Sequence, residues 1–510
     1  MILGAVLLWR VLLLVFTAQP VPANDAYFFD GAAVNSVQHG GFANPSLIRF
    51  TPFSATNVFC AYPPVYPLAM CGWMHAAGSG VLSSMWFHLV IFAGYLAVLA
   101  QLFHRWQLPG ARANWAALFL LALTFDDRPD TLAHWFGLLA LWGWLSIDRA
   151  RWTGWFPALG VTLAFWTNPE VGLIYGGVLG LLALVKVFHR QWKFPVFPLA
   201  ALILLPPLSV MLFKVWQPEL WAGFLEHAKQ TPSLTPLRLF VLNDWLKVLR
   251  AIPGTLCVAV VLPAHLRREN WSHPLFQAVG VMTLASLGIA AGAVTVFTAD
   301  WVSLAKYMQP LVVGAFLTWR FPAGTVLPRR WVATLAALVL LAAVRAIGMS
   351  TWGAACAADM DRAQALQAMR THVEHYSPGA TVVFSSAYLY EASAMNGITA
   401  LHEDWLHPIR AEKTELQADL DALTELKPAG MVLVQYDYYR RFQPVLRELL
   451  AHPEVVTITL TNCAHVPPPD AYHAMQRVLQ HVAWAPVIVD FKWQEPSGRV
   501  GSGRSPVPQN

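Results

Sequence analysis

The 510-residue chain is 56% hydrophobic and only 12% charged. Because soluble domains carry about 25% charged residues, this composition excludes an ordinary soluble protein and predicts a protein that lies in a lipid bilayer. The formal net charge of +5 is typical of basic cytoplasmic loops in membrane proteins, so it gives no reason to expect a nucleic-acid partner.

The first apolar segment, residues 2–18, has the length and the small following residues of a secretory signal. Arg10 lies in the middle of this segment, however, and no basic region precedes it. We therefore favour an uncleaved membrane helix over a cleaved signal, with the N-terminus of the chain in the cytoplasm.

Further apolar segments approach the length of about 20 residues that a membrane-spanning helix needs. They are residues 81–103, 112–126, 131–147, 154–168, 171–187, 195–215, 251–264, 274–297, 308–319 and 331–349. Together with the first segment they predict about eleven spans, although several are so short that neighbouring pairs can be broken or tilted helices.

Basic residues mark alternate connections between these segments, and the positive-inside rule places such connections in the cytoplasm. They are Arg105 and Arg112, Arg149 and Arg151, Lys186, Arg190 and Lys193, Arg267 and Arg268, and Arg320, Arg329 and Arg330. The remaining connections then face outward, and acidic residues gather in them. These outer connections include residues 24–33, 62–70, 126–130 and 167–170.

The composition changes near residue 351 to that of a small α/β domain. Runs typical of β-strands occupy residues 380–390, 430–439 and 454–463, and helical patterns occupy residues 413–427 and 440–452. An odd number of spans places this domain outside the cytoplasm. We therefore predict a membrane domain over residues 1–350, an extracytoplasmic α/β domain over residues 351–495, and a disordered Gly/Ser/Pro-rich tail over residues 496–510.

The cysteine pattern permits disulfides without showing that they form. Cys60 and Cys71 share the first outer loop, and Cys356 and Cys463 lie in the outer region, where an oxidising compartment allows pairing. Cys257 fits a small buried hydrophobic residue. No CxxC, HExxH or Walker motif is present, so the main signals for thiol redox chemistry, zinc proteolysis and nucleotide hydrolysis are missing.

An acidic stretch, NDAYFFDGAA at residues 24–33, follows the first apolar segment almost at once and contains Asp25 and Asp30. A carboxylate at the membrane surface can act as a general base, because partial desolvation raises its pKa. The alternative is an ordinary solvated loop acid or helix cap.

Two other outer connections carry charged residues that can serve a site. Asp127, Arg128 and Asp130 occupy a tight turn before an apolar segment, where Asp130 or Thr131 can instead simply cap the next helix. Lys306 and Tyr307, at the start of a late apolar segment, can bind a phosphate. The same two residue types are also common as anchors at the membrane interface.

The order of these features resembles that of a known family. Asp25 directly after the first helix, YPPVYPLAM at residues 62–70, RPD at residues 128–130 and KYMQP at residues 306–310 are similar to motifs of the GT-C glycosyltransferases. The similarity is greatest to bacterial relatives of protein O-mannosyltransferases and lipid A aminoarabinose transferases, and it covers about residues 1–350.

The resemblance implies a mainly α, polytopic protein of the bacterial inner membrane. It also implies a sugar donor linked to a polyprenyl phosphate, such as an undecaprenyl-phosphate sugar, and a glycan, lipid or protein acceptor on the periplasmic face. In such enzymes the first outer acid, here Asp25, activates the acceptor hydroxyl group for attack on the anomeric carbon, usually with inversion. The absence of a nucleotide-binding loop agrees with a lipid-linked donor.

The resemblance gives further residues their roles. Asp130, with Asp127 as the competing match, would help to place the acceptor or the base. Arg128, Lys306 and Tyr307 would offset the charge that develops on the departing phosphate. No metal-binding residues are assigned, and the dependence on a divalent metal stays open.

The sequence also departs from its relatives at three points. Asp25 is flanked by Asn24 and Ala26, where mannosyltransferases often have two adjacent acids. Tyr62 stands where aminoarabinose transferases often have a lysine. Glu170, in TNPE at residues 167–170, replaces a more basic stretch and fits a simple acid at a helix N-terminus. Neither named substrate therefore follows from the sequence.

Two other functions compete with the transferase. A lipid or sugar transporter or flippase would have interrupted helices around a midplane site, but the chain has no convincing internal repeats and little charge within its apolar segments beyond Arg10 and Arg345. A non-catalytic subunit of an envelope glycan assembly complex is the other alternative. Convergence of Asp25 and Asp130 on one cavity would favour the enzyme.

Overall fold

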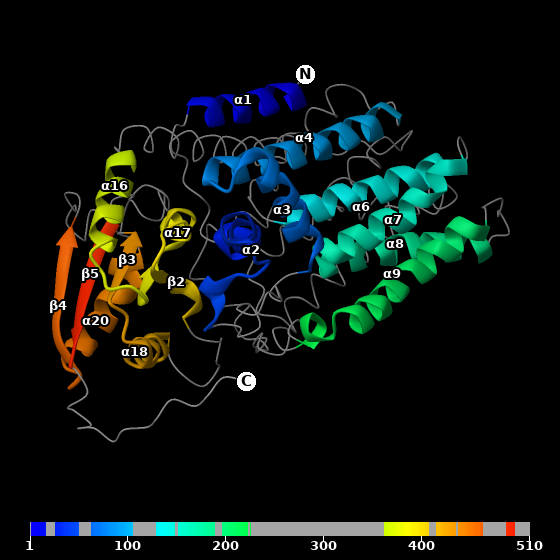
Figure 1. Ribbon diagram of the computed structural model, residues 1–510. Helices are drawn as coiled ribbons and strands as arrows, with labels where there is room; N and C mark the ends of the chain where they lie inside the picture. Colours follow the sequence, from blue (N-terminus) through cyan, green and yellow to red (C-terminus); the bar gives the residue numbers. More distant parts are fainter. Residues whose placement is uncertain are drawn as a thin grey trace, which may run out of the picture. The chain divides into compact units, whose positions relative to one another are not determined.

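The computed structural model describes residues 2–16, 26–49, 63–105, 129–147, 151–188, 196–222, 225, 362–406, 415–434, 437–462 and 486–494 (Figure 1). The chain divides into two compact units. The first unit comprises Met1–Met360 with Pro408–Arg410, and the second comprises Asp361–His407 with Ala411–Asn510.

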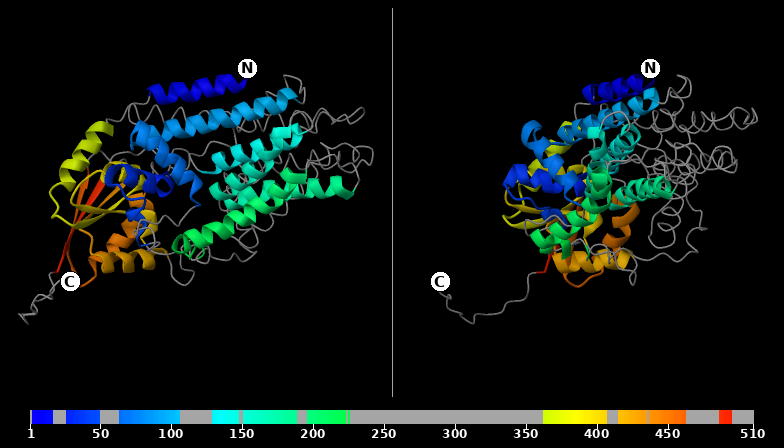
Figure 2. Two further views of the ribbon diagram at one scale, coloured as in Figure 1. Left: turned by 45° about the vertical axis from the view of Figure 1, so that its right-hand side comes forward. Right: turned by 90° about the vertical axis from the view of Figure 1, so that its right-hand side faces the viewer.

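The described part of the first unit is built from helices. They are α1 (Ile2–Phe16), α2 (Ala26–His39), α3 (Val65–Ala77), α4 (Val81–Arg105), α6 (Pro129–Ser146), α7 (Trp155–Thr167), α8 (Pro169–Phe188) and α9 (Val196–Trp216), with the short 3₁₀ turns η1 (Pro45–Leu47) and η3 (Arg151–Gly154). Helices α6, α7, α8 and α9 lie side by side (Figures 1 and 2). Their shared core includes Leu141, Val161 and Tyr175, each at most 4% exposed.

Helices α6 and α7 approach each other closely because of a glycine. A Cβ atom on Gly160 of α7 would lie 2.6 Å from the carbonyl oxygen of Phe136 and 2.8 Å from the Cβ of Ala140 on α6. A side chain at this position would therefore force the two backbones apart.

Six apolar segments of the sequence are helices in the structure. Helices α1, α4, α6, α7, α8 and α9 each begin and end within two residues of a predicted segment. Two of the described helices, over Val81–Leu102 and Leu199–Trp216, are long and apolar enough to cross a membrane. The other five predicted segments lie outside the described residues, so the number of about eleven spans stays a prediction.

Residues 24–33 and 62–70 were expected to be connections between apolar segments, but the described part of both stretches is helical. Their location on the outer side of the membrane stays a prediction. Residues 26–33 belong to α2 and residues 65–70 to α3. Ten consecutive residues of α2 are buried, including the polar Asp30 and Asn35. Polar residues made this stretch look like a loop in the sequence. The hydrogen-bond partners of Asp30 lie far away in the chain, so the sequence contained no sign that it is buried in a helix.

The second unit contains a five-stranded sheet with the strand order β2-β1-β3-β5-β4. The strands are β1 (Ala380–Phe384), β2 (Ile398–His402), β3 (Gly430–Val434), β4 (Val455–Asn462) and β5 (Pro486–Trp493), and the helices are α16 (Arg362–Val373), α17 (Ser386–Ala392), α18 (Glu415–Leu426) and α20 (Gln443–Leu450). Strands β2, β1 and β3 are parallel, whereas β5 is antiparallel to both β3 and β4. In register, Val383 of β1 pairs with Leu401 of β2 and Met431 of β3, and all three side chains are buried.

The sequence identified part of this sheet. Strands β1, β3 and β4 lie within the three predicted β-runs, and α18 and α20 lie within the two predicted helices. The first β-run was predicted too long, because its second half forms α17. Strand β5, which joins the parallel and antiparallel parts of the sheet, was not predicted. The domain boundaries and the location of this unit outside the cytoplasm stay predictions, and the tail over residues 496–510 lies outside the described residues.

Candidate functional site

Three of the predicted site residues lie in the described part of the chain: Asp30, Asp130 and Glu170. The others lie outside it, and these are Asp25, Tyr62, Asp127, Arg128, Lys306 and Tyr307. The expected convergence of Asp25 and Asp130 on one cavity therefore stays a prediction. The described residues nevertheless form two buried polar clusters in the first unit.

The first cluster is centred on Asp30, which is 0% exposed on α2. Oδ1 of Asp30 accepts a hydrogen bond from the hydroxyl group of Tyr66 on α3 at 2.8 Å. Oδ2 accepts a hydrogen bond from the hydroxyl group of Ser84 on α4. Asp30 is thus not a solvated loop acid, since this buried carboxyl group connects three helices.

A histidine extends the cluster. His88, one turn after Ser84 on α4, has its Nε2 atom 2.9 Å from the Tyr66 hydroxyl oxygen. Because the single Tyr66 proton is directed to Asp30, the Tyr66 oxygen must accept here and His88 must carry a proton on Nε2. The chain of donors therefore runs from His88 through Tyr66 to Asp30. We refer to Asp30, Tyr66, Ser84 and His88 as the Asp30 network.

Asn44, in the segment after α2, forms hydrogen bonds with the first turn of that helix. Its amide nitrogen donates to the carbonyl oxygens of Tyr27 and Phe28, each at 3.4 Å. Its Oδ1 accepts from the hydroxyl group of Ser46 at 2.6 Å. A Cβ atom on Gly31 would lie 2.3 Å from the Asn44 side chain. The start of α2, one residue after Asp25, is therefore held by side chains that are themselves buried.

The second cluster joins the N-terminal ends of α6 and α8. Asp130 is 5% exposed, and its Oδ1 accepts a hydrogen bond from Nδ2 of Asn168 at 2.6 Å. The other end of the Asn168 side chain caps α8, because its Oδ1 accepts from the backbone N–H groups of Glu170 at 3.0 Å and Val171 at 3.4 Å. Asn168 thus orients Asp130 and starts α8 at the same time.

The structure bears on two expectations from the sequence, that Asp130 or Thr131 caps α6 and that Glu170 lies at a helix N-terminus. Helix α6 begins at Pro129, so Asp130 lies in its first turn, and neither Asp130 nor Thr131 is the residue before the helix. Glu170 lies in the first turn of α8, which confirms its interpretation as an acid at a helix N-terminus. A negative charge is favourable at that end of a helix because the helix dipole is positive there.

Sequence reasoning missed most partners of these acids, although the spacing contains a signal. Ser84 and His88 are four residues apart on α4, and Asp130 and His134 are four apart on α6, so each pair shares one face of its helix. His134 is 0% exposed and its Nδ1 lies 3.5 Å from the hydroxyl group of Tyr175. Polar pairs at this spacing within apolar helices are a recognisable mark of a buried site.

Known proteins resemble this chain in fold but not detectably in sequence. No protein-family model matches the sequence, and no curated protein sequence matches it significantly. Among solved structures, ArnT from Cupriavidus metallidurans bound to undecaprenyl phosphate matches with a TM-score of 0.53 over 95% of this chain and 98% of that one, at 14% sequence identity. The apo structure of ArnT matches with a TM-score of 0.54 over 95% and 97% of the two chains, at 15% identity.

ArnT is a GT-C aminoarabinose transferase. The chain has the GT-C fold. The resemblance that the motifs predicted is thus confirmed at the level of fold, as is the prediction of a mainly helical protein. The match extends over almost the whole length of both chains, whereas the motifs covered only about residues 1–350. At 14–15% identity the match supports a shared fold but does not show the activity or the substrates of this chain.

Proposed function

We propose that this GT-C protein is a membrane glycosyltransferase that moves a sugar from a polyprenyl-phosphate donor to an acceptor hydroxyl group at the periplasmic face of the bacterial inner membrane. The observation that carries the proposal is the match over 95% of the chain to an ArnT structure that holds undecaprenyl phosphate. The motif order at Asp25, RPD and KYMQP supports the same donor.

The proposed reaction is a single displacement. The acceptor oxygen forms a bond to the anomeric carbon as the bond between that carbon and the phosphate oxygen breaks. The proton of the acceptor hydroxyl group passes to the carboxylate of Asp25, and the polyprenyl phosphate leaves with the bonding electrons. Arg128, Lys306 and Tyr307 stabilise the charge that forms on the phosphate, since fixed donors around a developing anion lower the barrier.

The buried clusters support this proposal because they fix Asp130 and the first turns of α2. Asp130 accepts a hydrogen bond from Asn168 at 2.6 Å, so its carboxylate has a defined direction, as the proposed role in placing the acceptor requires. The Asp30 network holds α2 against α3 and α4, and α2 begins directly after Asp25. Catalytic groups need such rigid support because small displacements reduce the rate strongly.

The decisive experiment measures sugar transfer by purified protein in lipid nanodiscs. A synthetic polyprenyl-phosphate sugar with a radiolabelled sugar is the donor, and a delipidated envelope extract supplies the acceptors. We expect transfer by the wild type and a loss of about 10²–10⁴ in rate for Asp25→Asn, which removes the general base. The matched control is Glu219→Gln, an exposed acid beyond α9, which should transfer at the wild-type rate.

Two results would overturn the proposal. If the wild type leaves every lipid-linked sugar intact while moving the intact lipid between leaflets, the protein is a flippase. If Asp25→Asn and Glu219→Gln transfer sugar equally fast, transfer occurs without the proposed base.

A further inference from the structure

The parallel strands of the second unit end together at an edge rich in titratable side chains. Strand β1 is followed by Ser385, β2 ends at His402 and is followed by Glu403 and Asp404, and β3 is followed three residues later by Asp437. Because β1, β2 and β3 are parallel, their carboxyl ends meet at the same edge of the sheet, which is where α/β domains bind ligands. We call His402, Glu403, Asp404 and Asp437 the strand-end cluster.

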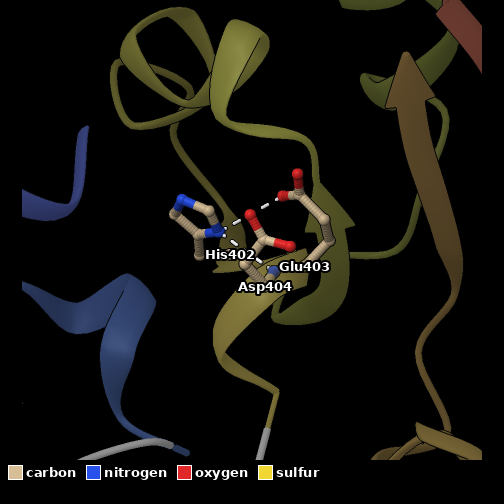
Figure 3. A group of neighbouring side chains, drawn as sticks. All are labelled: His402, Glu403 and Asp404. Atoms are coloured by element: carbon tan, nitrogen blue, oxygen red, sulfur yellow. Dashed lines mark hydrogen bonds and ion pairs between the residues drawn. The ribbon is translucent and has the colours of Figure 1, made fainter. Parts of the chain in front are cut away.

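The side chains of the strand-end cluster face one another. His402, Glu403 and Asp404 each offer a ligand atom, and these three atoms lie within 4.8 Å of one another (Figure 3). Ser385 donates to Oδ2 of Asp437 at 2.8 Å, and the backbone N–H of Ser386 donates to Oε1 of Glu403 at 3.3 Å. The four residues of the strand-end cluster, which come from the ends of β2 and β3, thus lie close to Ser385 at the end of β1.

Arg441 is the one described basic residue beside the strand-end cluster, and it forms ion pairs with Asp419 and Asp404. Arg441 donates to both oxygens of the fully buried Asp419, at 2.7 Å each, and to Oδ1 of Asp404 at 2.8 Å. The charges that act on Asp437 are those of Glu403 and Asp404. Glu403 and Asp437 therefore form an acidic pair with no cation of its own among the described residues.

Glu403 supplies a second and independent sign of a missing ligand. Its Oε2 is buried and receives no hydrogen bond from the described part of the chain, yet it lies 3.3 Å from Nδ1 of His402. That nitrogen accepts the backbone N–H of Asp404 at 3.1 Å, so it carries a lone pair and no proton. Nδ1 therefore gives no proton to Oε2, and this buried oxygen has no donor among the described residues. A cation beside Oε2 would supply the missing partner.

We propose that the strand-end cluster binds one divalent metal cation. The cation would be bound by Oε2 of Glu403 and a carboxylate oxygen of Asp404, and by Nδ1 of His402 once its lone pair leaves the Asp404 N–H that it now accepts. It would also neutralise the acidic pair that Glu403 forms with Asp437. Because the Asp404 side chain is 40% exposed, the cation can enter from solvent on that side.

The ligand atoms indicate the class of metal. Carboxylate oxygens suit Mg²⁺, Ca²⁺ and Mn²⁺, whereas an imidazole nitrogen favours transition metals. A site with both kinds of ligand therefore fits Mn²⁺ or Zn²⁺ better than Mg²⁺ or Ca²⁺. This site lies in the second unit and is independent of the sugar-transfer chemistry proposed for the first.

The test uses the full-length protein in detergent after treatment with EDTA. MnCl₂ is added in steps, and the free Mn²⁺ is measured by its electron paramagnetic resonance signal. We expect one strongly bound Mn²⁺ per chain that excess Zn²⁺ displaces and that is bound at least ~10-fold more weakly by Glu403→Gln. The control is Glu374→Gln, an exposed acid at the end of α16 in the same unit, which should bind Mn²⁺ like the wild type.

Thermal unfolding keeps the test decisive if Glu403→Gln folds poorly. Mn²⁺ should raise the melting temperature of the wild type and of Glu374→Gln, but it should raise that of His402→Ala much less, because this variant lacks the imidazole ligand. Absence of bound Mn²⁺ in the wild type at millimolar concentration would overturn the proposal. Equal affinity in Glu403→Gln and the wild type would do the same, because the bound metal would then lie elsewhere.

Discussion

The hydroxyl group of Tyr66 donates a hydrogen bond to Oδ1 of Asp30 across 2.8 Å, and both side chains are 0% exposed. The two residues lie on different helices, α3 and α2, so this bond fixes one helix against the other. The same hydroxyl oxygen accepts from His88 on α4. A single hydroxyl group therefore connects three helices of the first unit.

Removing that hydroxyl group should be costly. We expect Tyr66→Phe to lower the free energy of unfolding by about 1–3 kcal/mol, because it leaves buried polar partners without a hydrogen bond. The matched control is Tyr95→Phe on α4. The Tyr95 hydroxyl group is also buried but makes no hydrogen bond in the described part of the chain, so its removal should be neutral or slightly stabilising. Equal melting temperatures of the two variants in detergent would contradict the network.

Asp30→Asn should act on folding rather than on chemistry. Both carboxylate oxygens of Asp30 accept hydroxyl protons, whereas an amide offers only one acceptor and turns an N–H group toward the other donor. We expect a loss of about 1–3 kcal/mol of stability. The transfer rate for each folded molecule should change far less than in Asp25→Asn.

This contrast requires two measurements on the same samples, the folded fraction from size-exclusion chromatography and the initial rate of sugar transfer. A fall in rate without a fall in stability would place Asp30 in the chemistry.

The pair formed by Asp130 and Asn168 can be tested by exchanging its members. Asn168→Asp keeps the cap of α8, since Asp and Asn are equally good caps, but it sets two carboxylates against each other. We expect a loss of about 2–4 kcal/mol. The double variant Asp130→Asn/Asn168→Asp restores one donor and one acceptor and should recover most of that stability.

Stability and activity should separate in the exchanged pair. If the carboxylate at position 130 serves the reaction, the double variant is stable in thermal unfolding but transfers sugar slowly. Wild-type transfer by the double variant would reduce Asp130 to a structural residue.

Glycine substitutions test the close packing of α6 against α8 without changing any charge. A Cβ atom on Gly137 would lie 2.2 Å from the ring of Tyr175, whereas one on Gly177 of α8 would meet nothing within 4 Å. Gly137→Ala should therefore lose about 1–3 kcal/mol through overpacking. Gly177→Ala should gain about 0.5–1 kcal/mol because alanine favours the helix. Thermal unfolding of the two variants in detergent should show shifts of opposite sign.

The sequence by itself determined the features that depend on local order along the chain. Helices α1, α4, α6, α7, α8 and α9 follow from continuous apolar segments, and β1, β3 and β4 follow from short β-branched runs. The order of short motifs was sufficient to predict the GT-C fold, although the identity to the matching structures is only 14–15%.

Only the tertiary structure decided which polar residues are buried and paired. Tyr66 is 36 residues from Asp30 in the chain, Ser84 is 54 residues from it, and Asn168 is 38 residues from Asp130. A polar side chain can be buried when a partner compensates for its lost hydration, and no local pattern shows whether such a partner exists. For this reason α2 had the sequence of a polar loop, and β5 was recognised as a strand only through its neighbours β3 and β4.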